Sequence, residues 1–191
     1  MKKILSCFSL IVIFSLNLSS QVRDESLMSQ GYNKALTQFK TKEYIIKDIL
    51  NIPVDEIIGV EIDAITASKF GEISTVVYNC ESLDKKGLVF TFWANRINDY
   101  NTNYMGYAFR NIEYDKAAIL FEKLEKIMTE KKSVLNKGYN WNAVFRWEDL
   151  YFVFYVEGAS NKIRVFWNGY DSDWNQSNLK TTSRRFKKSF K

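Results

Sequence analysis

The residues best suited to bind a polar ligand follow a predicted strand near the C-terminus. A sugar or another polar ring offers an apolar face to aromatic planes and hydroxyl edges to amides and carboxylates. Both kinds of partner occur here within eight positions: Trp167, Asn168, Tyr170, Asp171, Asp173 and Trp174. The same residue types are typical of a turn whose Asp and Asn cap backbone N–H groups while Trp packs in the core. Both interpretations remain open.

A similar segment lies 74 residues earlier in the chain. Phe92-Trp93 is followed, six positions after the Trp, by Asp99-Tyr100-Asn101, and Phe166-Trp167 is followed at the same distance by Asp173-Trp174-Asn175. Two predicted hairpin turns, Asp84–Gly87 and Gly158–Asn161, share the offset. Two interpretations stay open: a duplication in which each half is three strands followed by a helix, and a chance match in so aromatic a chain. The earlier segment supplies a second set of candidate ligand-binding residues: Trp93, Asn95, Arg96, Asn98, Asp99 and Tyr100.

Histidine is absent from the chain. Its absence excludes Ser-His-Asp and Cys-His catalysis, histidine general bases and histidine-containing zinc sites. No phosphate-binding loop, CxxC pair or calcium loop occurs in the sequence. We therefore expect no cofactor and no metal site, and the sequence assigns no catalytic residue. Asp171 and Asp173 could act as a carboxylate acid/base pair, but two carboxylates two positions apart are also common in turns.

The positive charge of the chain belongs to its C-terminal tail, residues 180–191. Of the 27 basic residues, two lie in the first three positions and six in this tail. The rest of the chain has 19 basic and 22 acidic residues, so it is slightly acidic. An anionic membrane surface or polysaccharide could bind Arg184, Arg185, Lys187 and Lys188. The alternative is a solvated, frayed terminus whose phenylalanines pack back. We expect no nucleic-acid partner, because the signal peptide described next predicts export.

A secretory signal peptide is predicted over residues 1–21. Met1-Lys2-Lys3 is basic, Ile4–Leu18 is almost free of charge, and the small residues Ser19-Ser20 precede a polar start. The apolar run is shorter than the roughly 20 residues of a membrane span. We expect an exported protein, periplasmic or secreted, with no span in the mature chain. Residues 22–191 then form one domain, with Cys80 as a buried structural thiol.

Hydrophobic periodicity gives the elements that must position these residues. A long amphipathic helix is predicted over Tyr114–Leu135, helical material over Asp24–Leu50, and a short helix within Asn175–Lys191. Predicted strands precede and follow the long helix. They are Ile57–Ile65, Ile73–Cys80, Leu88–Ala94, Tyr104–Phe109, Trp141–Trp147, Leu150–Val156 and Lys162–Trp167.

The elements predict an α+β fold. We expect one antiparallel sheet of about six strands, with the long helix on one face and the N-terminal helical segment on another. Leu150–Val156 has no polar face, which favours a central strand covered on both sides. Most of the aromatic residues, 16% of the chain, should then be core, with Tyr151 and Tyr155 as candidates for an exposed partner surface.

These features favour a secreted or periplasmic, non-catalytic binding protein. Its ligand could be a glycan, another envelope component or a protein. The alternative is a small carboxylate-dependent hydrolase acting on envelope material, with Asp171 or Asp173 as its candidate acids.

Overall fold

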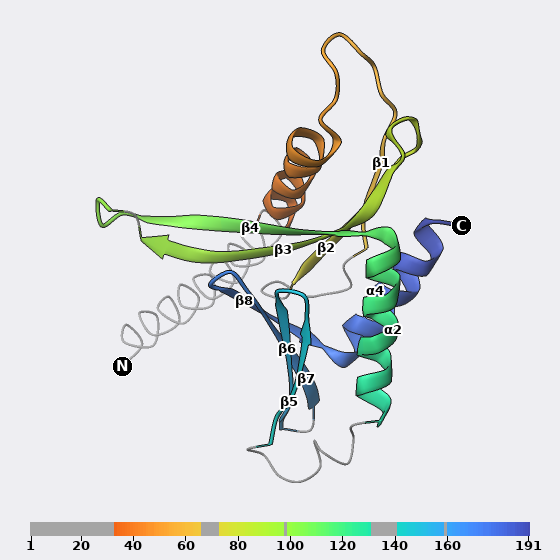
Figure 1. The fold of residues 1–191 in the computed structure, drawn as a ribbon. Coiled ribbons are helices and arrows are strands. Elements are labelled where there is room, and N and C mark those ends of the chain that lie inside the picture. Colours follow the sequence, from red (N-terminus) through yellow and green to blue (C-terminus); the bar gives the residue numbers. More distant parts are fainter. Residues whose placement is uncertain (1–32, 66–72, 98, 131–140, 159) are drawn as a thin grey trace, which may run out of the picture. The chain divides into compact units, whose positions relative to one another are not determined.

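The computed structural model describes residues 33–65, 73–97, 99–130, 141–158 and 160–191 (Figure 1). The predicted signal peptide, the turn Ser68–Gly71 and the last five residues of the predicted long helix lie outside this part. The chain divides into two compact units, residues 1–36 and 37–191. Of the first unit only residues 33–36 are described, and they are helical.

The second unit contains two antiparallel sheets of four strands each, in sequential order. Sheet A consists of β1 (Glu61–Ala64), β2 (Ser74–Cys80), β3 (Lys85–Ile97) and β4 (Asn103–Glu113). Sheet B consists of β5 (Ala143–Trp147), β6 (Leu150–Glu157), β7 (Ser160–Trp167) and β8 (Tyr170–Asn175). The helical elements are residues 37–44, which continue as the π-helix η1 (Ile45–Leu50), the short 3-10 helix η2 (Glu81–Leu83), α2 (Tyr114–Glu130) and α4 (Gln176–Ser189).

The predicted α+β class is confirmed, but the single sheet of about six strands is wrong. Each four-stranded sheet buries residues of its inner face in the same core, and the two sheets meet where the Ile73 N–H, just before β2, donates to the Asp173 carbonyl of β8 at 3.0 Å. Phe90 of β3 and Trp174 of β8 meet edge to face in this core, with ring centroids 5.7 Å apart. Periodicity predicts individual strands and hairpins, but it does not say whether distant hairpins share an edge.

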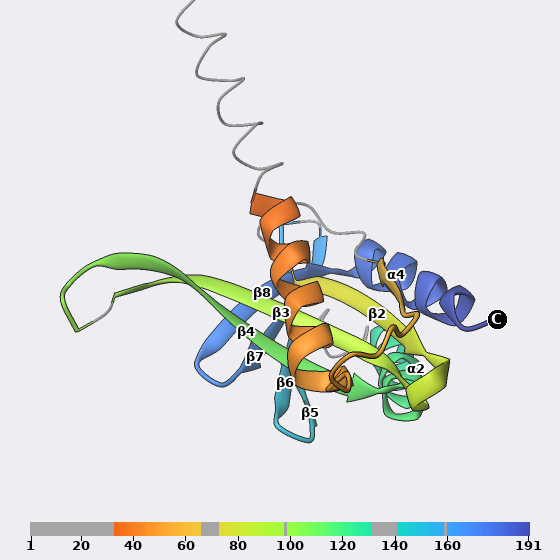
Figure 2. The same ribbon diagram turned by 90° about the horizontal axis from the view of Figure 1, so that it is seen from above.

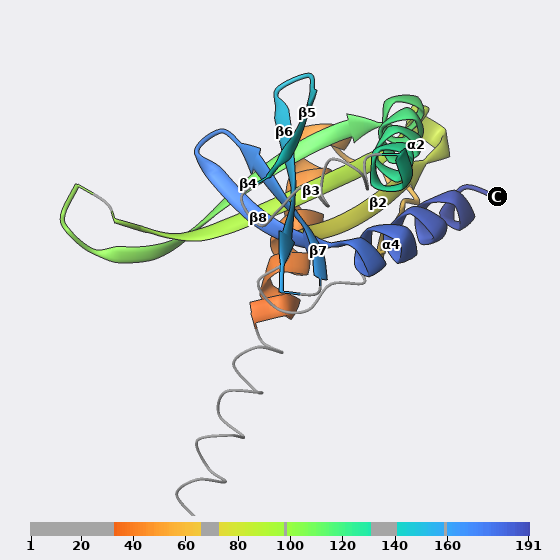
Figure 3. The same cartoon turned by 90° about the horizontal axis from the view of Figure 1, so that it is seen from below.

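Sheet A is covered on both faces (Figures 2 and 3). Successive residues of a strand point to opposite faces, so Leu88 and Phe90 enter the large core with α2, α4 and sheet B, whereas Val89 enters a smaller one. In that smaller core Ile45 and Leu50 of the N-terminal helix pack on β2. The predicted placement of the long helix and the N-terminal helical segment on different faces is therefore confirmed. Cys80 is buried in the smaller core, as predicted.

The buried stripe of α2 follows the predicted spacing of three and four residues. Ala117, Leu120, Phe121, Leu124 and Met128 are buried. Charged residues on the opposite face, such as Glu122 and Lys126, are exposed. The stripe faces the large core, so α2 covers one face of sheet A.

Two strands of sheet A are longer than predicted, and one is shorter. β3 extends to Ile97 and β4 begins at Asn103, within the segment that we predicted as a polar loop. Beyond Thr91 the β3 residues pair only with β4, so this hairpin extends past β2 and tolerates polar side chains on both faces. The turn predicted at Asp84–Gly87 lies earlier, because η2 makes the turn and β3 already begins at Lys85. β1 covers only the last part of the predicted first strand.

The predicted aromatic loop after Trp167 is a strand, β8. Asn168 and Gly169 have φ angles of 48° and 73°, the left-handed conformation that a two-residue type I′ turn requires at both positions. After this turn the side chains alternate between the two faces: Ser172 and Trp174 are buried, and Asp171 is exposed. Asp and Ser are uncommon in strands, which is why composition favoured a turn. The Asn-Gly dipeptide between two alternating segments is the signal that predicts the hairpin.

β6 is an inner strand of sheet B, but the prediction that it is covered on both sides is wrong. Leu150, Phe152 and Phe154 are buried, whereas Tyr151 is 41% exposed. Sheet B has the core on its inner face only. Aromatic residues on the outer face hide the alternation that would have predicted this.

The basic tail forms α4, which packs beside α2 in the large core (Figure 1). The side chain of Asn175 caps it by accepting a hydrogen bond from the Asn178 N–H at 2.9 Å. Leu179, Thr182 and Phe186 are buried, and the Phe186 ring stacks on Tyr114 with centroids 5.5 Å apart. Fraying is therefore wrong for residues 176–189, whereas the part of that interpretation in which the phenylalanines pack back is confirmed.

Both halves of the second unit have four strands followed by a helix, one strand more than the predicted repeat. The β2–β3 and β6–β7 hairpins match in kind but not in the predicted offset of 74, because Cys80 pairs with Lys85 and Glu157 with Ser160, which places the hairpin centres 76 positions apart. The second matched segment does not correspond either, because Asp99 lies in the β3–β4 turn whereas Asp173 lies within β8. A duplication of the sequence stays an open interpretation.

Candidate functional site

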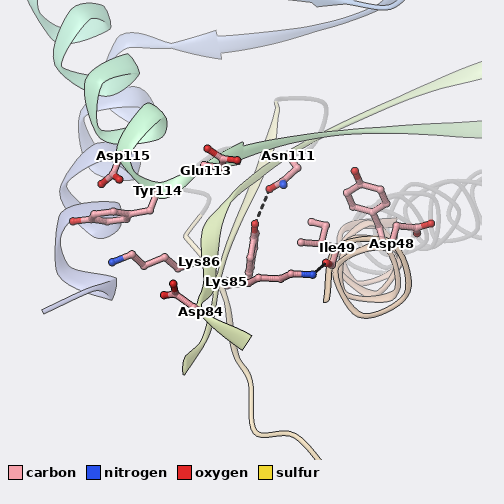
Figure 4. A pocket seen from close by; sticks show the side chains of 11 residues that line it. Asp48, Ile49, Asp84, Lys85, Lys86, Asn111, Glu113, Tyr114 and Asp115 are labelled. Carbon is pink, nitrogen blue, oxygen red and sulfur yellow. Dashed lines mark hydrogen bonds between the residues drawn. The ribbon is translucent and has the colours of Figure 1, made fainter. Parts of the chain in front are cut away.

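Two adjoining hollows lie along β4, and together we call them the β4 groove. Their volumes are about 520 and 380 Å³, and they share Tyr44, Asn111 and Glu113. The first lies between η1, the start of β3 and the start of α2 (Figure 4). The second extends from Phe109 toward the β5–β6 turn and Trp167. Each volume falls within the roughly 300–1,000 Å³ of small-molecule sites.

Aromatic rings give the groove a rigid apolar wall. Tyr44 stacks on Phe109 with ring centroids 4.8 Å apart and planes 12° apart. Tyr107 continues the row outside the two hollows, 6.3 Å from Phe109 and nearly parallel to it. The row forms because Tyr107, Phe109 and Asn111 alternate along β4 and so point to the same face. Such planes suit the apolar face of a ring-shaped ligand.

A buried tyrosine orients the amide at the centre of the groove. Tyr78 is 3% exposed, and this burial raises the pKa of its phenol above the ordinary value. The protonated hydroxyl donates to the Oδ1 atom of Asn111 at 3.0 Å (Figure 4). Since this oxygen is engaged, the amide N–H group of Asn111 is the donor available to a ligand.

Gly87→Ala tests how tightly this tyrosine is held. A Cβ atom at Gly87 would lie 2.7 Å from both the Ile112 carbonyl oxygen and the Tyr78 hydroxyl. Because the carbonyl belongs to a paired strand, the backbone or the tyrosine must shift. We expect a loss of about 1–3 kcal/mol in the free energy of unfolding, measured by urea denaturation. Gly59→Ala, which meets no atom within 4 Å, is the control and should change it by less than about 0.5 kcal/mol. Equal stability of both variants would contradict the crowding argument.

The cations of the groove are held by protein partners. Lys85 donates to the carbonyls of Ile49 and Leu50 at 2.6 and 3.1 Å, and so ties the end of η1 to β3. Lys86 lies 4.6 Å from the ring centroid of Tyr114. Cations positioned in this way shape the wall of the groove instead of being free to move.

An ion-pair network closes the other end of the groove. Arg110 contacts Glu148 at 2.6 Å and Asp149 at 2.9 Å. The indole N–H of Trp167 donates to Asp149 at 2.7 Å. Partial burial alone would raise the pKa of Asp149, but the hydrogen bonds from Trp167 and Arg110 outweigh it and lower this pKa below its ordinary value. Asp149 is therefore a carboxylate that positions the indole.

Four further carboxylates line the groove. They come from η1, the turn before β3, the end of β4 and the start of α2: Asp48, Asp84, Glu113 and Asp115. No ion pair within 4.0 Å involves them in the described part of the chain. They do not point toward a common centre in Figure 4. Such carboxylates are suited to accept hydrogen bonds from hydroxyl or amine groups around a ligand.

Of the candidate ligand-binding residues that the structure describes, which exclude Asn98, only Trp167 lines the groove. Trp174 is 1% exposed and lies between Phe90 and Phe121, so it offers no surface to a ligand. Asp171 and Asp173 lie on the outer face of sheet B, and both form ion pairs with Arg164.

The structure brings together members of both predicted segments beside the β7–β8 turn. The guanidinium of Arg96 lies 4.0 Å from the ring centroid of Tyr170 and donates to the Gly169 carbonyl at 2.8 Å. Asn168 supplies the first residue of that turn. Trp93 is half-buried, whereas Asp99 and Tyr100 lie exposed in the β3–β4 turn. This contact joins the two sheets.

Sequence reasoning missed most of the groove. Tyr44, Tyr78 and Asn111 come from three segments far apart in the chain, and only strand pairing and helix docking bring them together. The alternation of Tyr107, Phe109 and Asn111 was the one local signal, and it appears only once β4 is extended beyond Phe109.

Comparison with protein-family models gave no match, and comparisons with curated proteins and with solved structures gave none either. Within the residues that the structure describes, no helix is long and apolar enough to span a membrane. Nor does this part of the chain gather three or more Cys, Asp or Glu residues that could hold a metal ion.

Proposed function

We propose that this protein is an exported, non-catalytic binding protein that holds a glycan in the β4 groove. The observation that carries the proposal is the row of stacked aromatic rings beside the oriented amide of Asn111. A sugar ring would pack its apolar face against the part of the Tyr44–Phe109 stack that the two rings do not cover for each other, while its hydroxyl groups exchange hydrogen bonds with Asn111 and the carboxylates. The predicted signal peptide supports export to the envelope, where polysaccharides are abundant partners.

The fixed charges of the groove support binding without chemistry. Arg110, Lys85 and Lys86 are engaged by carboxylates, carbonyls and an aromatic ring, so the site is organised before a ligand arrives. Preorganisation lowers the entropic cost of binding a polar molecule. The chain has no histidine to act as a general base.

Affinity electrophoresis through gels that contain single neutral polysaccharides tests this proposal. We expect one of them to retard the wild-type protein and Tyr44→Ala to weaken its binding about tenfold, because a stacked ring contributes about 0.5–1.5 kcal/mol beyond its buried area. Asn111→Ala should also weaken binding. Tyr151→Ala is the matched control, because it removes an exposed tyrosine from the outer face of sheet B. Equal retardation of Tyr44→Ala and wild type, with both folded, would overturn the groove as the site.

One observation favours a second candidate, a carboxylate-dependent hydrolase. Carboxylates from separate segments, including Asp84 and Glu113, line the same groove, which is where an acid and a base would have to come from. Asp171 and Asp173 are poorer candidates because each pairs with Arg164. Release of new reducing ends from the bound polysaccharide, abolished in Glu113→Gln, would support the hydrolase over the binding protein.

A further inference from the structure

α4 presents a stripe of cations on its outward side. Lys180, Arg184, Lys187 and Lys188 are all exposed, and at 100° per residue they fall within about 100° of the helix circumference. Leu179, Thr182 and Phe186 occupy the opposite side and are buried. The stripe is therefore fixed on an ordered element and extends for about 12 Å along it.

Few acidic side chains of the protein neutralise the charges of this stripe. Lys187 contacts Glu125 of α2 at 3.2 Å. Within the described residues, no other ion pair within 4.0 Å involves the stripe. Four closely spaced cations with one acidic partner repel one another, so an anionic partner would relieve this repulsion.

A polar hollow adjoins the N-terminal end of the stripe. It has a volume of about 530 Å³, and Lys180 belongs to both features. Lys162 lines its other side, and the side chains between the two lysines are amides and hydroxyls of the start of β7, the end of β8 and the start of α4. None of the described residues that line the hollow is a carboxylate, although Glu157 approaches Lys162 at 3.7 Å from outside it. Two lysines with amides and hydroxyls between them suit an acidic sugar, which carries a carboxylate and several hydroxyl groups.

We propose that the stripe and the hollow together bind a linear anionic polysaccharide. A single line of charges matches a chain with acidic groups along its length, and the concave hollow can take one sugar unit that a flat membrane surface cannot fill. Phe186 is buried and Phe190 packs on Tyr114, so α4 offers neither phenylalanine for insertion into a bilayer. This site is separate from the β4 groove, because the two share no lining residue.

Binding of the purified protein to polygalacturonate at low salt tests the proposal. Fully methyl-esterified polygalacturonate has the same backbone without the charge. We expect the wild-type protein to bind only the acidic polymer, with an affinity that falls as salt is raised. The triple variant Lys180→Gln/Arg184→Gln/Lys188→Gln should bind the acidic polymer at least about tenfold more weakly than wild type. The charge-matched control Lys42→Gln/Lys47→Gln/Lys126→Gln removes three exposed lysines elsewhere and should bind within about twofold of wild type.

Further variants and ligands in the same binding experiment distinguish this site from the β4 groove and from membrane or nucleic-acid binding. Lys162→Gln should weaken binding, because only the hollow uses that lysine, whereas Tyr44→Ala should leave it unchanged. Equal binding of the triple variant and its control would overturn the proposal. So would preferential binding to phosphatidylglycerol vesicles or to a single-stranded DNA oligonucleotide over polygalacturonate.

Discussion

Leu124→Asp is expected to abolish the cooperative thermal unfolding transition of the protein. Leu124 lies in the middle of the buried stripe of α2 and is 0% exposed. The substitution removes about 1.5–3 kcal/mol of apolar burial and places a carboxylate in the core, where an unpaired polar group costs several kcal/mol more. Domains of this size are stable by only about 5–15 kcal/mol.

A charge change on the solvent-exposed face of the same helix is the control. Lys126→Asp alters an exposed residue whose nearest partner is Glu130, at 3.8 Å. We expect it to change the free energy of unfolding by less than about 1 kcal/mol. Circular dichroism melts compare the two variants. A Leu124→Asp protein that melts like Lys126→Asp would show that α2 is not a core element.

Trp174→Ala is expected to have the second largest effect. The side chain is 1% exposed, and its ring meets both Phe90 of sheet A and Phe121 of α2 edge to face, with centroids 5.7 and 6.2 Å apart. Removing it leaves a cavity where both sheets and α2 meet. We expect a loss of about 3–5 kcal/mol in the free energy of unfolding and a melting temperature lower by roughly 6–20 °C.

Trp167→Ala is the informative comparison, because both tryptophans were candidate ligand-binding residues. Trp167 is half-buried and donates to Asp149 at the end of the β4 groove. We expect Trp167→Ala to cost less than about 2 kcal/mol and to weaken glycan binding. If Trp174→Ala were the milder substitution, the assignment of Trp174 to the core would be wrong.

Local patterns predicted the elements of this fold far better than their arrangement. The stripe from Ala117 to Met128 has the period of a helix buried on one side, and the β-branched residues of β2 predict a strand without knowledge of their neighbours. The meeting of the two sheets depends on contacts such as Phe90 with Trp174, which lie 84 positions apart. The spacing of hydrophobic residues within one element does not show which distant residues will contact each other.

The site was predicted less well than the fold. Aromatic and polar residues close together in sequence favoured Trp167–Trp174, but alternation along β8 separates them, so Trp174 enters the core and Asp171 faces solvent. The groove instead joins Tyr44 of the N-terminal helix to Asn111 of β4, two residues that sheet A and its covering helix bring together. The Asn168-Gly169 turn was a readable signal that would have corrected the first error.

Amide hydrogen exchange in the presence and absence of the retarding polysaccharide tests the β4 groove most directly. The proposed function predicts slower exchange in β4 and in η1, where Asn111 and the residues beside Tyr44 would contact the ligand. Exchange in β6 and β7, whose outer face carries Tyr151, should not change. Protection confined to sheet B or to α4, with none in β4, would contradict the central claim that the groove is the glycan-binding site.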